Sequence, residues 1–295
     1  MSWFTSFPQI DDGYLRDLKR VIDEGFRNFT RSYGDMIEGF FSPLQSVLIW
    51  SERLLTNAPW PIVLLIVAAL AWGASRSLRV VIGSVLTLVL IGMFGMWDDT
   101  MKTVSMILAA TLLSIAIGLP LGILMARSER VQSVLNPILD VMQTMPSFVY
   151  LIPVVMLLGI GRVPGLIAVV IYALPPMIRL TNLGIRQVDR EVLEAADAFG
   201  SSAWQKLVKA ELPLALPTIM AGINQTIMMA LAMVVIASMI GVQGLGQPVL
   251  RAISNQYFTL GLFNGFAIVG IAILFDRVSQ AWGKRLQKHR EASHG

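Results

Sequence analysis

The sequence predicts an all-α protein that crosses a membrane several times. Only 14% of its 295 residues are charged and 55% are hydrophobic, whereas roughly 25% of the residues in a typical soluble domain are charged. Six windows of 18 to 39 residues contain no charged residue, and about 20 apolar residues in a helix suffice to cross a bilayer. These observations exclude a soluble enzyme, a nucleic-acid-binding module and a disordered scaffold.

The composition also excludes the commonest kinds of metal-binding and catalytic site. The chain has no cysteine, and its two histidines, His289 and His294, lie within the last seven residues. A Cys/His metal site or a histidine-based catalytic triad therefore cannot be built. The GxxxxGK(S/T) pattern of a P-loop is missing as well, so we expect no ATP bound through such a loop. We expect no catalytic residue, no metal and no cofactor in this chain.

Residues 1–57 are expected to form an amphipathic segment ahead of the spans. Residues 1–58 contain six basic and eight acidic residues, without a basic start followed by an apolar run. Apolar residues recur every three to four positions, as on one face of a helix: Ile10, Tyr14, Leu18, Ile22, Phe26, Phe29 and Tyr33. This pattern predicts a helix at a membrane surface or on the protein's own outer face. The alternative is a soluble tail helix with no role beyond packing.

Seven spans fit the uncharged windows: 58–75, 79–97, 102–126, 141–160, 163–181, 213–240 and 259–277. Prolines predict discontinuous helices in the fourth span (Pro146, Pro153) and in the fifth (Pro175, Pro176). Arg179, within the fifth span, must snorkel or pair. Gly118 and Gly122 have GxxxG spacing, which predicts close helix packing. The glycine-rich stretch 241–246 is expected to leave the helix.

The positions of the basic residues predict the orientation. Fourteen lysines and arginines fall in one set of loops and at the C-terminus, three in the opposite loops and six in the N-terminal segment. Cytoplasmic loops carry the excess of these residues. The expected protein therefore has its N-terminal segment outside, a transmembrane domain over 58–281 and a cytoplasmic basic tail over 282–295.

The longest internal loop, about 182–212, is polar and rich in helix formers. Residues 188–196 read as a short helix that Gly200 would stop in a left-handed conformation. A second helical stretch, 203–212, leads into Pro213. Two short helices at right angles would form a knob on the cytoplasmic side. The small residues Ala195 and Ala196 on the knob would let another protein approach closely.

The spacing of Glu194, Ala195, Ala196 and Gly200, followed by Leu212 and Pro213, resembles the EAA motif of bacterial ATP-binding-cassette (ABC) importer permeases. Ala210 departs from that motif, which prefers isoleucine there. The alternative is an ordinary helical loop with a chance EAA. By resemblance, the loop contains the helix that docks into a cytoplasmic ATPase. Glu194 would pair with groups on that partner, and Ala195, Ala196 and Gly200 would act by their small size.

Further stretches resemble permeases for glycine betaine, proline betaine, choline and carnitine. These stretches are 143–153 (QTMPSFVYLIP), 173–181 (ALPPMIRLT), 221–226 (AGINQT) and 244–246 (GLG). The resemblance covers about residues 60–280. It implies an importer for quaternary ammonium compatible solutes; the alternatives are an amino acid or trimethylamine N-oxide importer of the same architecture, or an ion-coupled secondary transporter.

The resemblance also implies the architecture and the partners. We expect the type I ABC importer permease fold in the bacterial inner membrane, in contact with lipid. A second copy of the chain would complete the pore, and two ATPase copies would bind the ATP. An external binding protein would select the substrate. No nucleic acid is expected as a partner.

Six residues are candidates for a substrate pathway. Phe148, Tyr150 and Tyr172 could offer aromatic faces to a quaternary ammonium group through cation–π contacts, although such residues are more often core or membrane-belt aromatics. Gln143, Asn224 and Gln225 are polar at membrane depth. They could line the pore or join neighbouring helices by hydrogen bonds.

Overall fold

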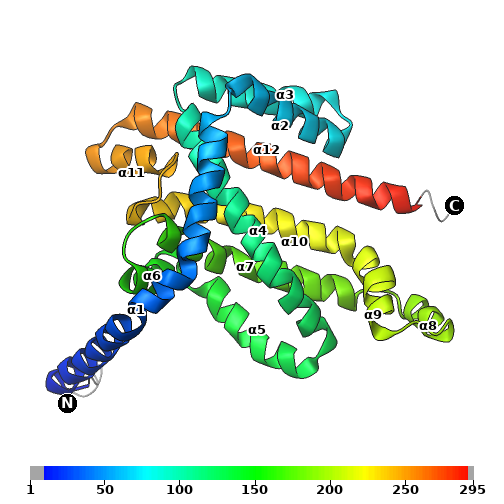
Figure 1. Cartoon of the computed structure of the whole chain (residues 1–295), viewed down its shortest axis with the longest axis horizontal. Helices are drawn as coiled ribbons and strands as arrows, with labels where there is room; N and C mark the ends of the chain where they lie inside the picture. The colour runs from blue at the N-terminus through cyan, green and yellow to red at the C-terminus, as the bar shows by residue number, and fades with distance from the viewer. Residues whose placement is uncertain (1–9, 292–295) are drawn as a thin grey trace, which may run out of the picture.

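The computed structural model describes residues 10–291, apart from the side chains of Asp35, Glu38, Lys284 and residues 286–291. Every regular element in that range is a helix (Figure 1). The long helices are α1 (Asp12–Asn57), α2 (Trp60–Ser75), α3 (Leu78–Met93), α4 (Trp97–Arg127), α5 (Glu129–Thr144), α7 (Arg162–Arg186), α10 (Leu212–Ala237) and α12 (Phe258–Glu291). The shorter elements are η2 (Ser147–Tyr150), α6 (Leu151–Leu158), α8 (Arg190–Ala198), α9 (Ala203–Lys206), η3 (Leu207–Glu211), η4 (Ser238–Ile240) and α11 (Gly246–Asn255). Most of the expected basic tail over 282–295 lies outside the described side chains, including Lys288, His289, Arg290 and His294.

The prediction of an all-α polytopic membrane protein is confirmed. Among the described residues, four helical stretches are long and apolar enough to span a membrane, and two bent pairs raise the number to six. The seven expected spans correspond to α2, α3, α4, the α5–α6 pair, α7, α10 and α12. Helix α3 is apolar but has only 16 residues. At 1.5 Å per residue it is about 24 Å long, less than the roughly 30 Å hydrocarbon layer.

The expected break at Pro175 and Pro176 is wrong, because α7 continues through both prolines to Arg186. Both prolines are buried, and α7 packs mainly against α4 and α10. Each proline removes one backbone hydrogen bond, but proline is tolerated inside membrane helices when neighbouring helices and polar side chains satisfy the freed groups. Arg179 pairs with Asp140 of α5, which meets its need for a partner.

The fourth expected span is discontinuous, as Pro146 predicted. Helix α5 ends at Thr144, and the chain turns by 112° into η2 and α6. Pro153 lies in the first turn of α6 and does not interrupt it. Residues 127–140 fall in a loop between the expected third and fourth spans, but most of them form the first part of the amphipathic helix α5. This helix begins at Glu129, and the side chain of Ser128 caps it by accepting a hydrogen bond from the amide of Val131 (3.4 Å).

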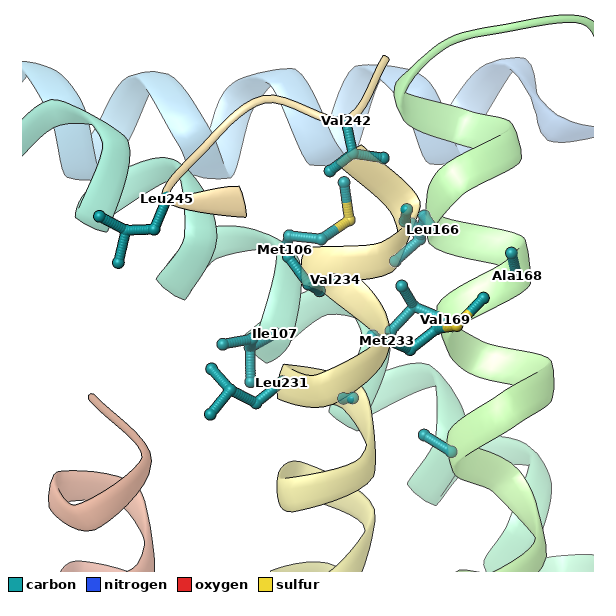
Figure 2. Close-up of a cluster of buried hydrophobic side chains, with 14 of the residues drawn as sticks. Met106, Ile107, Leu166, Ala168, Val169, Leu231, Met233, Val234, Val242 and Leu245 are labelled. Carbon is teal, nitrogen blue, oxygen red and sulfur yellow. The ribbon is translucent and has the colours of Figure 1, made fainter. Parts of the chain in front are cut away.

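The core lies where α4, α7 and α10 meet. Figure 2 shows side chains from these helices packed together, including Met106 and Ile107, Leu166 and Val169, and Leu231 and Val234, all buried. Val242 and Leu245, from the glycine-rich stretch after α10, lie over one end of this cluster. That stretch leaves the helix as predicted, with positive φ at Gly241 and Gly244.

Glycines set the spacing of these helices. A Cβ on Gly122 would lie 2.5 Å from Cβ of Thr181, and a Cβ on Gly118 would lie 2.8 Å from Cγ of Met177. Both contacts join α4 to α7, as the GxxxG spacing predicted. Small residues at such interfaces permit close van der Waals packing, which drives helix association in lipid.

The predicted N-terminal helix is present as α1, 46 residues long. Its predicted apolar face is mostly exposed before residue 40, as at Tyr14, Ile22 and Phe29. Further along, α1 lies across the ends of α4, α6 and α7 (Figure 1). Leu48 is only 2% exposed, and Glu52 pairs with Arg162 of α7 at 3.1 Å. A bend of 105° separates this part of α1 from α2.

The bundle has two ends that are used as landmarks below. Helices α8 and α9, the α2–α3 and α4–α5 turns and the end of α12 lie at one end, called the α8 end (Figure 1). Helices α6 and α11 lie at the other, called the α11 end.

Replacing Gly122 by alanine is expected to destabilise the protein. The new methyl group would overlap Thr181 and the carbonyl of Ile178, and overpacking of this kind costs about 1–3 kcal/mol. Gly265→Ala is the control, because a Cβ there meets nothing within 4 Å and alanine favours a helix. Thermal unfolding in detergent should show a lower melting temperature for Gly122→Ala only. Equal melting temperatures would contradict the packing account.

Candidate functional site

Helices α8 and α9 form the knob predicted from the sequence. Asp189 caps α8 by accepting a hydrogen bond from the amide of Glu191 at 2.9 Å. Gly200 ends α8 with φ of 75°, the left-handed conformation that glycine adopts without strain. Ser202 then begins α9 with a capping box closed by Gln205. The local sequence therefore dictates both helices and the turn between them.

Most of the knob is exposed. No residue of α8 is buried, and Glu194 forms no ion pair with the part of the chain that the structure describes. Two aromatic residues flank the turn: Phe199 is 91% exposed and Trp204 is 71% exposed. Exposed aromatic side chains of this kind are typical of partner-binding surfaces. The sequence analysis missed both, although two aromatics beside Gly200 in a polar loop were a visible signal.

Charged side chains brace the knob against the bundle. Within the knob, Lys206 of α9 pairs with Asp197 of α8 at 2.7 Å. At the end of α4, the guanidinium of Arg127 donates to the carbonyl of Ala203 at 3.2 Å and to the carboxylate of Glu211 at 2.9 Å. The Glu211 side chain is only 9% exposed. Since η3 continues directly into α10, this pair fixes the knob to both α4 and α10.

A second brace holds the end of α7, from which the knob begins. The guanidinium of Arg186 donates to Glu129 at 2.7 Å, to Asn182 at 3.0 Å and to the carbonyl of Met125 at 3.2 Å. These contacts join α7 to α5 and α4. A partner that displaces α8 would therefore displace the ends of the three helices that form the core.

The candidate pathway residues fall into separate groups. Tyr150 is buried, its hydroxyl donates to the carbonyl of Met142, and its ring lies 5.7 Å from that of Tyr172 in an edge-on contact. Gln143 and Phe148 are exposed on α5 and η2. Asn224 and Gln225 of α10 line a different groove, of about 460 Å³, beside α12. The structure therefore brings the two tyrosines together but does not gather all six residues.

Asn224 joins α10 to α12. Its amide donates to the carboxylate of Asp276 at 3.0 Å, and its carbonyl accepts from the hydroxyl of Ser279 at 2.5 Å. Hydrogen bonds between helices in a membrane are worth about 1 kcal/mol each. This geometry favours the interhelical role for Asn224 over a pore-lining one.

The structure is thus a polytopic helical bundle with an exposed helical knob at one end, as in a membrane-embedded subunit. Residues 118–288 match the family model described as "Binding-protein-dependent transport system inner membrane component". Because the match covers more than half of the chain, the protein belongs to this family. It is a permease subunit of an ABC importer, as the EAA resemblance predicted.

The chain is similar to several characterised permeases. It is 46% identical to the glycine betaine/proline betaine permease ProW of Escherichia coli, over 92% of this chain and 76% of ProW. It is 47% identical to the glycine betaine/carnitine permease GbuB of Listeria monocytogenes, over 84% of this chain and 90% of GbuB. The trimethylamine N-oxide permease TmoV of Ruegeria pomeroyi is 35% identical, over 91% of this chain and 41% of TmoV.

A solved structure confirms the fold class. The inward-facing MetNI methionine ABC transporter matches with a TM-score of 0.58 and 19% identity, over 63% of this chain and 93% of that chain. This likeness supports the type I importer permease architecture.

Breaking the pair between Arg127 and Glu211 is expected to loosen the knob. Arg127→Leu leaves the buried carboxylate without its partner, which costs about 1–3 kcal/mol. Adding Glu211→Leu should restore part of the loss, because replacing a buried ion pair by apolar residues is often neutral.

Melting temperatures of the two single variants and the double variant test this coupling. Asp197→Asn is the control. It breaks the ion pair between Lys206 and Asp197, whose carboxylate is more exposed than that of Glu211, and should cost under about 1 kcal/mol. Strictly additive losses at Arg127 and Glu211 would contradict the brace.

Proposed function

We propose that this permease imports glycine betaine and related quaternary ammonium compounds, choline among them. The observation that carries the proposal is the 46–47% identity to two glycine betaine permeases over most of the chain. Trimethylamine N-oxide is the second candidate, supported by 35% identity to a permease of which 41% is covered. An amino acid substrate and ion-coupled transport have no such support.

The knob is the surface that we assign to the partner ATPase, which would bind ATP while this chain holds no cofactor. Glu194 would pair with basic or amide groups in a groove of that partner. Ala195, Ala196 and Gly200 would permit close approach. Phe199 and Trp204 would serve as apolar anchors, since exposed aromatics dominate the energetics of many interfaces.

The working assembly that we propose contains two copies of this chain, two ATPase subunits and an external binding protein. Binding of ATP would pull the two knobs together and tilt α4, α7 and α10. The ATP-bound partner must favour one pore state over the other, because a ligand shifts an equilibrium only by its differential affinity.

The orientation follows from the charges. We assign the α8 end to the cytoplasm because most lysines and arginines lie there, which is the usual bias of cytoplasmic loops. Residues 1–57 then lie outside, and the tail over 282–295 is cytoplasmic. The apolar face of α1, with Tyr14, Ile22 and Phe29 exposed, suits the membrane surface.

The pathway assignment is also a proposal. Gln143 and Phe148 are exposed beside other exposed apolar residues of α5 and α6, such as Val141 and Ile152. We assign this face to the contact with the second copy, where the pore would form. Tyr150 and Tyr172 would support the aromatic wall behind Phe148, and Gln225 would line the groove beside Asn224.

Uptake of labelled glycine betaine, choline and trimethylamine N-oxide tests the function. The chain is expressed with its ATPase and binding protein, or without the ATPase, in a bacterial strain that lacks its own carriers. We expect glycine betaine uptake only when the ATPase is present. Uptake by the chain alone would indicate a secondary transporter, and ATPase-dependent uptake of trimethylamine N-oxide alone would change the substrate but not the mechanism.

Substitutions on α8 test the docking surface. Glu194→Arg should reduce uptake at least tenfold. Phe199→Ala should reduce it roughly 30-fold, since loss of an interface anchor costs about 2 kcal/mol and every change of about 1.4 kcal/mol is a factor of ten. Asp98→Arg is the matched control, because it reverses an exposed acid on α4 at the α11 end. Unchanged uptake in both α8 variants, with normal amounts of protein in the membrane, would refute this assignment.

A further inference from the structure

A groove of about 320 Å³ lies between α3 and α12 near the α8 end. It is lined by Arg79, Val80, Gly83, Ser84 and Thr87 of α3 and by Ile273, Leu274 and Arg277 of α12. The two helices touch where a Cβ on Gly270 would lie 2.7 Å from Cγ2 of Thr87. One turn nearer the α8 end, a Cβ on Gly83 would meet nothing within 4 Å. The groove is therefore the space that opens as the helices diverge.

Two exposed arginines flank this groove. Arg79 and Arg277 pair with no carboxylate among the described residues, whereas Arg127, Arg162, Arg179 and Arg186 each do. Asp276 is next to Arg277 in the sequence, but its carboxylate accepts hydrogen bonds from Asn224 and Gln280 instead.

The local backbone increases the positive charge. Arg79 lies in the first turn of α3, which contains no acidic residue, and the Ser77 side chain makes no capping hydrogen bond. The N-terminus of a helix carries a partial positive charge that disfavours an arginine. An anion between the two guanidinium groups would offset this repulsion, and guanidinium groups bind phosphate through paired hydrogen bonds.

The rest of the groove is mostly apolar. Beyond the arginines its walls are Val80, Ile273 and Leu274, with Gly83, Ser84 and Thr87 completing the α3 side. Exposed apolar side chains continue along both helices, as at Leu86 and Leu90 of α3 and Phe266 and Val269 of α12. In a membrane, such surfaces contact acyl chains. The site thus combines a cationic mouth at one membrane boundary with an apolar trough toward the membrane centre.

We propose that this groove binds an anionic phospholipid. Its phosphate would lie between Arg79 and Arg277, and one acyl chain would follow the cleft between α3 and α12. Ser84 and Thr87 would form part of the wall beside the lipid. Basic pockets between transmembrane helices on the cytoplasmic side commonly bind acidic headgroups. A free phosphate ion would use the arginines but would leave the apolar trough unoccupied, so the lipid is the better fit.

The bound lipid would fasten the α2–α3 hairpin to the bundle. The hairpin contacts the rest of the protein mainly through α12. At its α8 end, the guanidinium of Arg285 donates to the carbonyl of Gly73, and the lipid would add a second link between the same elements.

Native mass spectrometry of the full-length chain in non-ionic detergent tests the proposal. The probes are dioleoyl-phosphatidylglycerol and dioleoyl-phosphatidylcholine. We expect at least tenfold tighter binding of phosphatidylglycerol, and loss of that preference in the double variant Arg79→Gln/Arg277→Gln. The control Arg130→Gln/Arg251→Gln removes two other exposed arginines, which have no ion-pair partner among the described residues, and should keep the preference. Equal binding of both lipids by the wild type, or equal loss in the control, would overturn the proposal.

A second variant fills the groove without changing charge. Gly83→Leu should lower phosphatidylglycerol binding at least tenfold, whereas Gly265→Leu, also in open space, should not. Inorganic phosphate is tested alone on the wild type, and its binding with the same arginine dependence would overturn the lipid assignment in favour of a free anion. A change in the oligomeric mass of the Arg79→Gln/Arg277→Gln variant without a change in lipid binding would instead assign the groove to contact between copies. None of these measurements depends on transport.

Discussion

Helix α7 lies between α4 and α10, and glycine contacts on both sides hold the three backbones together. Gly122 of α4 faces Thr181, Gly184 of α7 faces Thr218, and Gly222 of α10 faces Leu180. In lipid, apolar side chains gain little by leaving the solvent, so the energy of association comes from close van der Waals contact. This contact requires small residues at defined positions. The other elements are arranged around this core: α1 crosses one end, the α2–α3 hairpin packs beside α12, and the knob begins from α7 and ends in α10.

The knob lies between two core helices in the chain and contacts the third. Short turns join α8 to α7 and to α9, η3 runs directly into α10, and Arg127 ties the knob to α4 through Glu211 and Ala203. A displacement of α8 would therefore be passed to α4, α7 and α10. The knob also carries exposed aromatics and a carboxylate without an ion-pair partner among the described residues. The same short segment thus offers an exposed surface and direct contacts to the core helices.

Much of the fold could be predicted because the membrane imposes a length on uncharged segments, and that length is visible in the sequence. The turn at Gly200 and the break at Pro146 could also be predicted, since each depends on local backbone chemistry. Helix α5 was assigned in part to a loop because a search for uncharged windows does not detect an amphipathic helix. The pair of Pro175 and Pro176 was misleading, because the packing around the continuous helix α7 comes from α4 and α10 and not from neighbouring residues.

The site was predictable only in part. Spacing predicted Glu194, Ala195, Ala196 and Gly200 as docking residues, and the structure places them on or beside the exposed helix α8. Arg127 and Glu211, by contrast, are 84 residues apart, and nothing local in the sequence connects them. Phe199 and Trp204 flank Gly200 in a polar loop, which is visible in the sequence, but their exposure of 91% and 71% depends on the fold. The groove beside Arg79 and Arg277 likewise requires the packing of α3 on α12, which the sequence does not reveal.

The central claim is that α8 docks into the ATPase, and it can be measured directly because the chain contains no cysteine. A single cysteine is introduced as Phe199→Cys, and its rate of labelling by a maleimide is measured with and without the ATPase. Ile253→Cys, at an exposed position of α11 at the opposite end, is the control. The account predicts that the ATPase slows labelling at position 199 at least tenfold and leaves position 253 unchanged. Equal labelling rates at position 199 in the free and assembled protein would contradict it.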